Sequence, residues 1–403
     1  MKLSVPTNWD EQILGSCDPS SVDEVYGNFS SDIMGEGNYL FSGVSARDLR
    51  GHIKLVRDKG ISFNYSLSAV CLDNREWSRG WQRRMEGVLG RLACAGVDRL
   101  TVGVPYLLEL IKKRYPEFKV DIAAGAHIDS VARARSWVEL GADSLILSDV
   151  RVNRDFKLIK AIRAAVGCEL KLIANNACLQ YCPFSLHHSV SNAHAFCPDR
   201  GKEGGAVDYN RLKCRHICLS DPVIFLKTAW IRPEDMEFYH SLGIDAFMLV
   251  SRVMTTEKLE RIINAYRLRR YDADLMDLIW GTSYNNTFPT FNIFTRAPRS
   301  FKTDAVLREK AFLRLEDCAV HIDNRGLDGF VQHLYAIGCN AADCGECRFC
   351  DKTAVKVMKY DESERLRAVK SLDNSLKALL AAECFDNLSR SRARGGAGKR
   401  GPG

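Results

Sequence analysis

The chain has 403 residues, 46% of them hydrophobic, and a formal net charge of +7 at pH 7. This composition predicts a globular protein with a sizeable core, and the lack of about 18 uninterrupted apolar residues argues against a membrane-spanning helix. The first residues, MKLSVPTNWDEQILGS, lack the basic start and apolar core of a secretory signal, so we expect a cytoplasmic location.

Eight short apolar runs alternate with helical patterns from residue 22 onward. The runs begin at Val22, Ile61, Asp98, Lys119, Asp143, Glu169, Pro222 and Ile244. Between them, segments such as 129–140 repeat apolar residues every three or four positions, which is typical of amphipathic helices. Eight such units predict an α/β fold, a (β/α)8 TIM-like barrel over residues 22–279, with residues 1–21 as a lead-in.

Polar residues follow several of these runs, where the active site of such a barrel lies. They are Asn28, Asn64, His127, Asp149, Asn175, Asn176, Trp230, Arg232 and Arg252. Arg232 and Arg252 suit a carboxylate or phosphate, because guanidinium binds these groups through two hydrogen bonds. Arg232 could instead pair with Glu234 or Asp235, and helix capping is the simpler interpretation of Asp149.

A long insertion, residues 175–221, follows the run at Glu169 and contains the first group of cysteines. The group is Cys178, Cys182, Cys197, Cys214 and Cys218. In a reducing compartment, clustered cysteines indicate metal binding more often than disulfides. Four thiolates could bind zinc or a [4Fe-4S] cluster, and spacing alone does not choose between them.

The second group of cysteines lies in a C-terminal extension, residues 280–360. The motif CNAADCGECRFC places Cys339, Cys344, Cys347 and Cys350 with x4, x2 and x2 spacing, which predicts a second metal site holding iron–sulfur or zinc. The six other cysteines are scattered and are interpreted as free thiols.

The chain is predicted to end in a helix, residues 361–388, and a disordered tail, residues 389–403. The tail holds five basic residues and no acidic ones, which leaves +2 of the +7 for the rest of the chain. It could attract RNA nonspecifically, although a solubilising tail is the simpler interpretation.

The motifs NNACLQYCPF and KTAWIRPEDMEFYHSLGIDAFMLVSR, with the histidine pair His187 and His188 between them, resemble the collagenase-like proteins of peptidase family U32. The likeness covers about residues 22–270, and the cysteine-rich C-terminal region resembles a less-studied branch. The family includes UbiU/UbiV-type iron–sulfur proteins, which hydroxylate without oxygen and work as a pair, and RNA-modifying members, with prephenate as hydroxyl source in some.

This resemblance implies one [4Fe-4S] cluster on four cysteines, with Cys178 and Cys182 matching the start of the ligand set. Cys197, Cys214 and Cys218 are candidates for the other two places. The sequence departs from the RNA-modifying members, which have a glycine- and serine-rich motif where this chain has NNAC. Asn176, His187, His188, Arg232 and Arg252 are the residues expected to act on the substrate.

The resulting prediction is an iron–sulfur, oxygen-independent hydroxylase-like or related redox enzyme acting on a small molecule, a peptide or an RNA base, with a paired subunit as a further expectation. A U32-type peptidase is one alternative, although neither an HExxH helix nor a Gly-x-Ser-x-Gly turn is present. A non-catalytic iron–sulfur or zinc subunit of a larger complex is the other.

Overall fold

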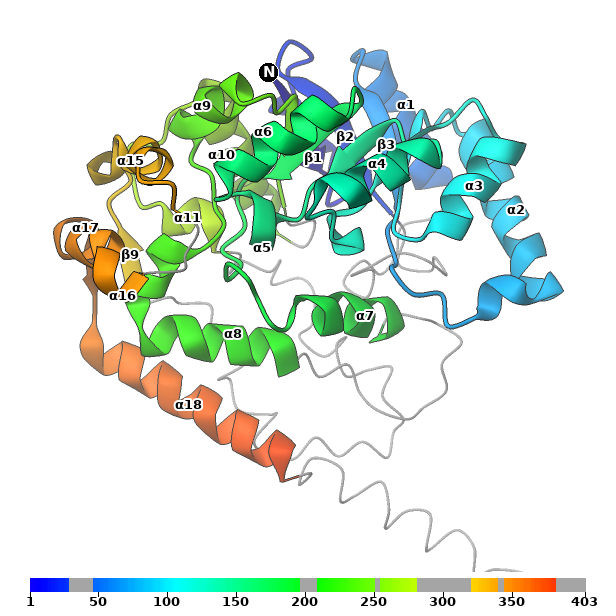
Figure 1. The fold of residues 1–403 in the computed structure, drawn as a ribbon. Coiled ribbons are helices and arrows are strands. Elements are labelled where there is room, and N and C mark those ends of the chain that lie inside the picture. The colour runs from blue at the N-terminus through cyan, green and yellow to red at the C-terminus, as the bar shows by residue number, and fades with distance from the viewer. Residues whose placement is uncertain (29–45, 196–208, 251–253, 281–319, 340–343, 382–403) are drawn as a thin grey trace, which may run out of the picture.

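The computed structural model describes residues 1–28, 46–195, 209–250, 254–280, 320–339 and 344–381. Eight parallel strands close into a barrel in chain order, and β8 pairs with β1 (Figure 1). The strands are β1 (Lys2–Pro6), β2 (Val22–Gly27), β3 (Ser62–Leu67), β4 (Arg99–Val102), β5 (Lys119–Ile122), β6 (Ser144–Ile146), β7 (Glu169–Ile173) and β8 (Ala246–Met248). The predicted (β/α)8 TIM-like barrel is confirmed.

Two of the expected strand positions are wrong. The segment interpreted as a lead-in supplies β1, whose Leu3 and Val5 are buried in the core. The apolar run from Pro222 is not a strand but the 3-10 helix η5 (Pro222–Lys227). The side chain of Asp221 accepts a hydrogen bond from the Val223 N–H, and proline suits the first helical position. A short apolar run predicts burial, but it does not distinguish a strand from a helical turn.

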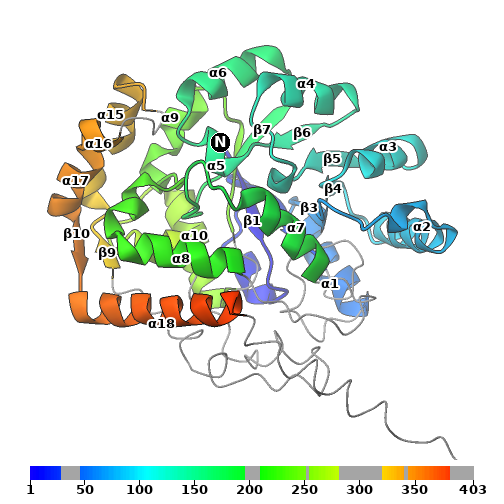
Figure 2. The same ribbon diagram turned by 60° about the horizontal axis from the view of Figure 1, so that its bottom comes forward.

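Helices surround the barrel and bury one face each (Figure 2). In α6, for example, Phe156, Ile159 and Ile162 are buried. The helices are α1 (Ala46–Asp58), α2 (Arg79–Cys94), α3 (Pro105–Arg114), α4 (Val131–Glu139), α5 (Asp149–Val152), α6 (Phe156–Ala165), α9 (Met236–Ser241) and α10 (Thr256–Leu268). Short 3-10 helices are η1 (Glu11–Gly15), η3 (Arg75–Trp77), η4 (Ala124–Ala126), η6 (Pro233–Asp235) and η7 (Arg325–Leu327).

Charged side chains occupy the middle of the barrel, where apolar layers are usual. The Lys171 ammonium lies 2.8 Å from a carboxylate oxygen of Asp121 and 2.9 Å from one of Glu24. Arg99 bonds the same Asp121 at 3.0 Å. Lys171, Asp121 and Glu24 are each no more than 2% exposed. The barrel therefore depends on a buried ion network whose members come from β2, β4, β5 and β7.

The insertion and the C-terminal extension lie on the carboxyl side of the strands. The insertion forms α7 (Ser185–Ala195) and α8 (Tyr209–Ser220). After the barrel come α11 (Met276–Ile279), β9 (Val320–Ile322), α15 (Phe330–Ala336), α16 (Cys344–Cys347), α17 (Phe349–Val357), β10 (Met358–Tyr360) and α18 (Glu362–Leu380). α18 runs alongside α8 (Figures 1 and 2). Arg365 of α18 donates hydrogen bonds to the carbonyls of Leu219 and Ser220 at the end of α8. None of the helices described could cross a membrane.

Candidate functional site

The loop after β7 presents Cys178 and Cys182 at the carboxyl end of the barrel. Its backbone is fixed at both cysteines: the Ala229 N–H donates to the Cys178 carbonyl at 2.9 Å, and the Ser185 N–H donates to the Cys182 carbonyl at 3.3 Å. Between them, the Tyr181 N–H donates to the Val150 carbonyl at 2.7 Å. The two thiols are therefore held by main-chain contacts that do not require a bound metal.

Cys214, from α8, joins these two cysteines. Burial raises the pKa of the Cys178 thiol well above its ordinary value, and negative charge on Asp149, Cys214 and Cys182 raises it further. Burial likewise raises the pKa of Cys182. Because charge effects weaken with distance, these three thiols and the carboxyl group share one neighbourhood. The structure thus brings together three of the five cysteines predicted for the first site.

Of the remaining two predicted cysteines, Cys218 is described by the structure and Cys197 is not. Cys218 lies one helical turn beyond Cys214 in α8 and is only 2% exposed, within the apolar core. Cys197 lies outside the described residues. Among the described residues, Cys218 is therefore the predicted cysteine that is left as a candidate for the fourth ligand.

Thiols of this kind could bind zinc or a [4Fe-4S] cluster. Zinc holds its ligands about 2.3 Å from one ion, whereas in a [4Fe-4S] cluster each thiolate binds a different iron. Across the described parts of the chain, no three His, Cys, Asp or Glu side chains form a group that could hold one metal ion.

A carboxylate and an amide stand beside these cysteines. Asp149 begins α5 directly after β6, is 8% exposed, and accepts a hydrogen bond from the Asn176 amide at 2.8 Å. Burial raises the pKa of Asp149, although the Asn176 bond opposes this effect. Asn176 therefore lies beside this group of cysteines. Asp149 is a site residue that the capping interpretation undervalued, and its place directly after a barrel strand was the available signal.

The histidine pair, His187 and His188, lies on α7. The ring of His187 contacts Asn210 Oδ1 at 2.9 Å and Ser191 Oγ at 3.3 Å, which uses both ring nitrogens and links α7 to α8. His188 is half-buried, and its N–H donates to the Phe184 carbonyl. The geometry gives His187 a structural explanation without a catalytic one.

Arg232 is buried and engaged within the protein. Its guanidinium donates to both carboxylate oxygens of Asp235, at 2.8 and 3.1 Å, to the Asn324 carbonyl at 2.8 Å, and to Asp328 at 3.2 Å. The structure thus shows the pairing with Asp235, not a guanidinium open to substrate, because these acceptors take its donors. Arg252 lies outside the described residues.

Asn175 and Trp230 also serve the framework. Asn175 accepts from the Val250 N–H at 2.7 Å and donates to the Val250 and Leu278 carbonyls. The Trp230 indole is fully buried and donates to the Phe225 carbonyl at 2.7 Å. Neither side chain presents a polar group to a substrate.

A second thiol at this end of the barrel has a histidine partner. Cys71 lies in the segment after β3, and its Sγ is 3.1 Å from Nε2 of His194 on α7. The sequence interpretation treated Cys71 as a scattered free thiol, because its partner is more than a hundred residues away. A thiol beside an imidazole is the arrangement of an activated nucleophile.

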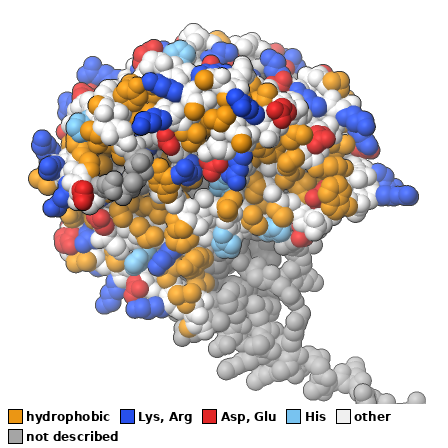
Figure 3. All heavy atoms as spheres, in the orientation of Figure 1, with side chains coloured by type: hydrophobic (Ala, Val, Ile, Leu, Met, Phe, Trp, Pro, Cys, Tyr) orange, Lys and Arg blue, Asp and Glu red, His pale blue; other side chains and the backbone are white. Residues whose placement is uncertain are grey.

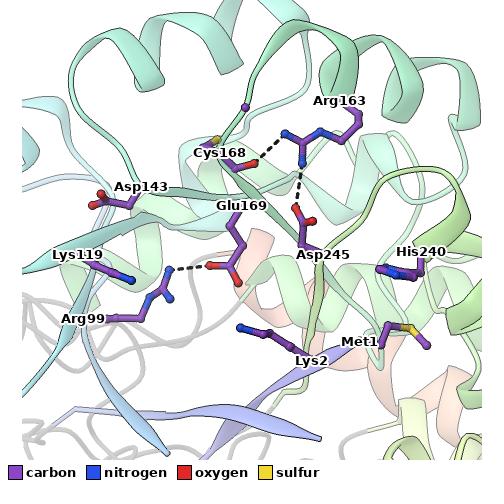
Figure 4. Close-up of a pocket in the computed structure, with 11 residues that line it drawn as sticks. Met1, Lys2, Arg99, Lys119, Asp143, Arg163, Cys168, Glu169, His240 and Asp245 are labelled. Carbon is purple, nitrogen blue, oxygen red and sulfur yellow. Dashed lines mark hydrogen bonds and ion pairs between the residues drawn. The ribbon is translucent and has the colours of Figure 1, made fainter.

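A cavity of 650 Å³ lies at the opposite, amino end of the barrel and contains none of the predicted site residues (Figure 4). It is lined by first residues of strands, including Lys2, Arg99, Lys119 and Glu169. Arg99 forms an ion pair with Glu169 at 2.6 Å, so these two charges neutralise each other. This end of a TIM barrel normally contributes stability, not catalysis.

Comparisons with known proteins agree with the sequence resemblance. The chain is 27% identical over 336 residues to an uncharacterized protease, MJ1657, from Methanocaldococcus jannaschii. The aligned region covers 83% of this chain and 89% of the relative. That match is longer than residues 1–279, so it continues into the C-terminal extension. No protein-family model matches the chain.

Among solved structures, the U32 peptidase Mk0906 is 20% identical, with a TM-score of 0.47 over 62% of this chain and 92% of its own. A thiamine phosphate pyrophosphorylase from Pyrococcus furiosus is 13% identical, with a TM-score of 0.36 over 66% and 94%. The chain is thus similar in sequence to a protein named a protease, and weakly similar in structure to one U32 peptidase.

Proposed function

We propose that the chain is an iron–sulfur enzyme that hydroxylates an organic substrate without oxygen, with a small organic co-substrate supplying the hydroxyl group and being reduced in exchange, or that it carries out a closely related redox reaction. The supporting observation is the gathering of Cys178, Cys182 and Cys214, from two separate segments, at the carboxyl end of a TIM-like barrel. Cys218 is the proposed fourth ligand. We propose a [4Fe-4S] cluster for this set, in agreement with the U32 resemblance.

When bound by four thiolates, such a cluster would supply one-electron transfer. The protein's own residues position the substrate. Asp149 fixes the Asn176 amide by accepting its hydrogen bond, and the Asn176 side chain is close enough to Cys178 to oppose the rise in the pKa of that thiol. α7 and α8 lie over this end of the barrel, where they limit access of water (Figure 1).

The charge pattern favours a small or weakly charged substrate. Apart from the tail, the chain is nearly neutral. The face shown in Figure 3 intersperses basic and acidic side chains without a basic stripe. Binding a large RNA requires a basic patch, so we propose a small molecule or a peptide as substrate.

A thiol hydrolase is the second candidate function, and the Cys71–His194 contact is the observation that favours it. The similar protein from Methanocaldococcus jannaschii is named a protease, although an uncharacterized one. In this proposal Cys71 attacks a carbonyl carbon and His194 takes the thiol proton.

Comparing products with and without the gene tests the first proposal and separates it from the second. Deleting the gene from the source organism, grown without oxygen, should yield one metabolite, peptide or RNA base lighter by one oxygen atom, measured by mass spectrometry. The intact chain and Cys168→Ala, a cysteine at the opposite end of the barrel, should restore the oxygen. Cys178→Ala should not.

Other outcomes of this comparison have definite meanings. Restoration by Cys178→Ala would contradict the hydroxylase proposal. Accumulation of an uncleaved peptide that Cys71→Ala cannot correct would establish the hydrolase instead. An unchanged set of products would favour a non-catalytic subunit.

A further inference from the structure

A buried arginine, Arg154, lies between the barrel and the C-terminal cysteine group and has no carboxylate partner in the part of the chain that the structure describes. Arg154 is 3% exposed, and its guanidinium stacks 4.4 Å from the Trp230 ring and 5.7 Å from the Phe330 ring. Its Nε and Nη2 donate to the Thr228 carbonyl at 3.4 Å, and Nη1 has no acceptor among the described residues.

The other neighbour of this guanidinium is neutral. The Tyr239 hydroxyl is close enough for Arg154 to oppose the rise that burial causes in the Tyr239 pKa, yet it donates its own proton to the Asn153 carbonyl at 2.7 Å. A buried charge that is paired only with neutral groups is costly. The surroundings of Arg154 therefore call for an anion.

The aromatic rings beside Arg154 lead to α17. Phe330, which stacks under Arg154, stacks in turn on Phe349 with ring centres 5.3 Å apart, and Cys350 follows directly. Lys227, beside Thr228, pairs with Asp351 at 3.7 Å. Two basic side chains thus face the part of α17 that carries Cys350.

The four C-terminal cysteines lie on neighbouring short elements: Cys344 and Cys347 begin and end α16, Cys350 is the second residue of α17, and Cys339 and Cys350 both pack against the core. Negative charge on Cys339 and Cys347 adds to the effect of burial in raising the pKa of Cys344, while Lys227 opposes it. Burial, together with Cys339 and Cys344, raises the pKa of Cys350 to about 11, against the opposing effects of Arg154 and Lys227. The group therefore brings four thiols and two basic side chains together.

We propose that Cys339, Cys344, Cys347 and Cys350 bind a second [4Fe-4S] cluster, and that Arg154 is the buried counter-charge of this cluster. Four thiolates on an oxidised cluster give a net charge of about −2, and Arg154 would offset one of these charges, since Lys227 is already paired with Asp351. Zinc with four thiolates would have the same charge, so metal analysis decides between the two.

This second centre is a neighbour of the barrel group. The Lys227–Trp230 segment contacts both: Ala229 bonds the Cys178 carbonyl, and Lys227 pairs with Asp351 beside Cys350. The inference does not depend on the proposed function, because it rests on a different set of thiols and on Arg154.

Iron and acid-labile sulfide, measured on the full chain purified without oxygen, test the second centre. The intact chain should contain about eight irons, and Cys347→Ala should contain about four. Cys94→Ala is the matched control, because both cysteines are exposed, and it should retain about eight. Cys178→Ala should keep about four irons in the C-terminal group.

The outcomes separate this inference from the proposed function. Iron that survives Cys347→Ala unchanged but is lost in Cys178→Ala would overturn the second cluster alone. Iron lost only in Cys347→Ala would support the second cluster and overturn the barrel cluster. Zinc that is lost in Cys347→Ala would overturn the iron–sulfur assignment of the C-terminal group.

The role of Arg154 is tested by the reduction potential of the C-terminal cluster, read by paramagnetic resonance in the Cys178→Ala background. Arg154→Met should shift the midpoint to lower potential, because loss of a positive charge disfavours the more negative reduced cluster. Arg154→Lys should keep the potential near that of the parent. If Arg154→Met does not fold, Lys227→Met should give a smaller shift in the same direction. An unchanged potential would overturn the counter-charge role.

Discussion

Replacing Cys178 with alanine should remove the iron of the barrel site while leaving the protein folded. The Cys178 backbone contact with Ala229 uses only the carbonyl and survives the substitution. Removing a half-buried sulfur should therefore cost only about 1 kcal/mol of unfolding free energy. A cluster that loses one of four thiolates is exposed to solvent and oxygen, so we expect loss of about four irons. Metal analysis and thermal unfolding of the purified variant measure both effects.

Cys168→Ala is the control for this experiment. Cys168 is also half-buried, but it lines the cavity at the amino end of the barrel, far from the proposed cluster. It should retain all of its iron. Equal iron in the two variants would contradict the assignment of Cys178 as a ligand, and unfolding of Cys178→Ala alone would indicate a structural role.

Replacing Lys171 with methionine should destabilise the barrel by about 3–5 kcal/mol, because it leaves Asp121 and Glu24 buried with one cation fewer. Burial alone would raise the pKa of Asp121, but Lys171 and Arg99 outweigh it and keep the pKa below its usual value. Lys54→Met, which breaks an exposed pair with Asp58, should cost about 0.5 kcal/mol or less. Denaturant unfolding of both variants gives the comparison.

This ion network also predicts the pH dependence of stability. Because the pKa of Asp121 is lower in the folded chain than in the unfolded one, its contribution is present above the ordinary carboxyl pKa. It is lost as the pH falls below that value toward the folded pKa. Lys171→Met should therefore lose less stability than the intact chain on acidification through this range. Equal losses would show that the network does not stabilise the folded state.

The sequence predicts the barrel well because eight apolar runs at regular spacing have few other arrangements. The sequence analysis misplaces two strands, because contacts between residues far apart in the chain decide which apolar runs become strands. β1 is only five residues long, and its pairing with β8 joins the two ends of the barrel. The run from Pro222 is apolar because η5 is buried, and burial is common to strands and helical turns.

The candidate site is predictable in part. The position of Cys178 and Cys182 directly after β7 is visible in the sequence, and the structure places Cys214, one of the three other predicted candidates, near them from a helix about thirty residues away. The partners of Arg232 include Asn324 and Asp328, and that of Cys71 is His194. Such contacts between distant segments leave no local pattern, so the sequence could not distinguish a structural arginine from a substrate-binding one.

The measurement that tests the central claim most directly is iron and acid-labile sulfide content, with a paramagnetic resonance spectrum, on Cys347→Ala purified without oxygen. This variant isolates the barrel site from the C-terminal cysteines. We predict about four irons and four sulfides per chain, and a signal that appears on one-electron reduction. Zinc in place of iron, or no bound metal, would contradict an iron–sulfur centre at Cys178, Cys182 and Cys214.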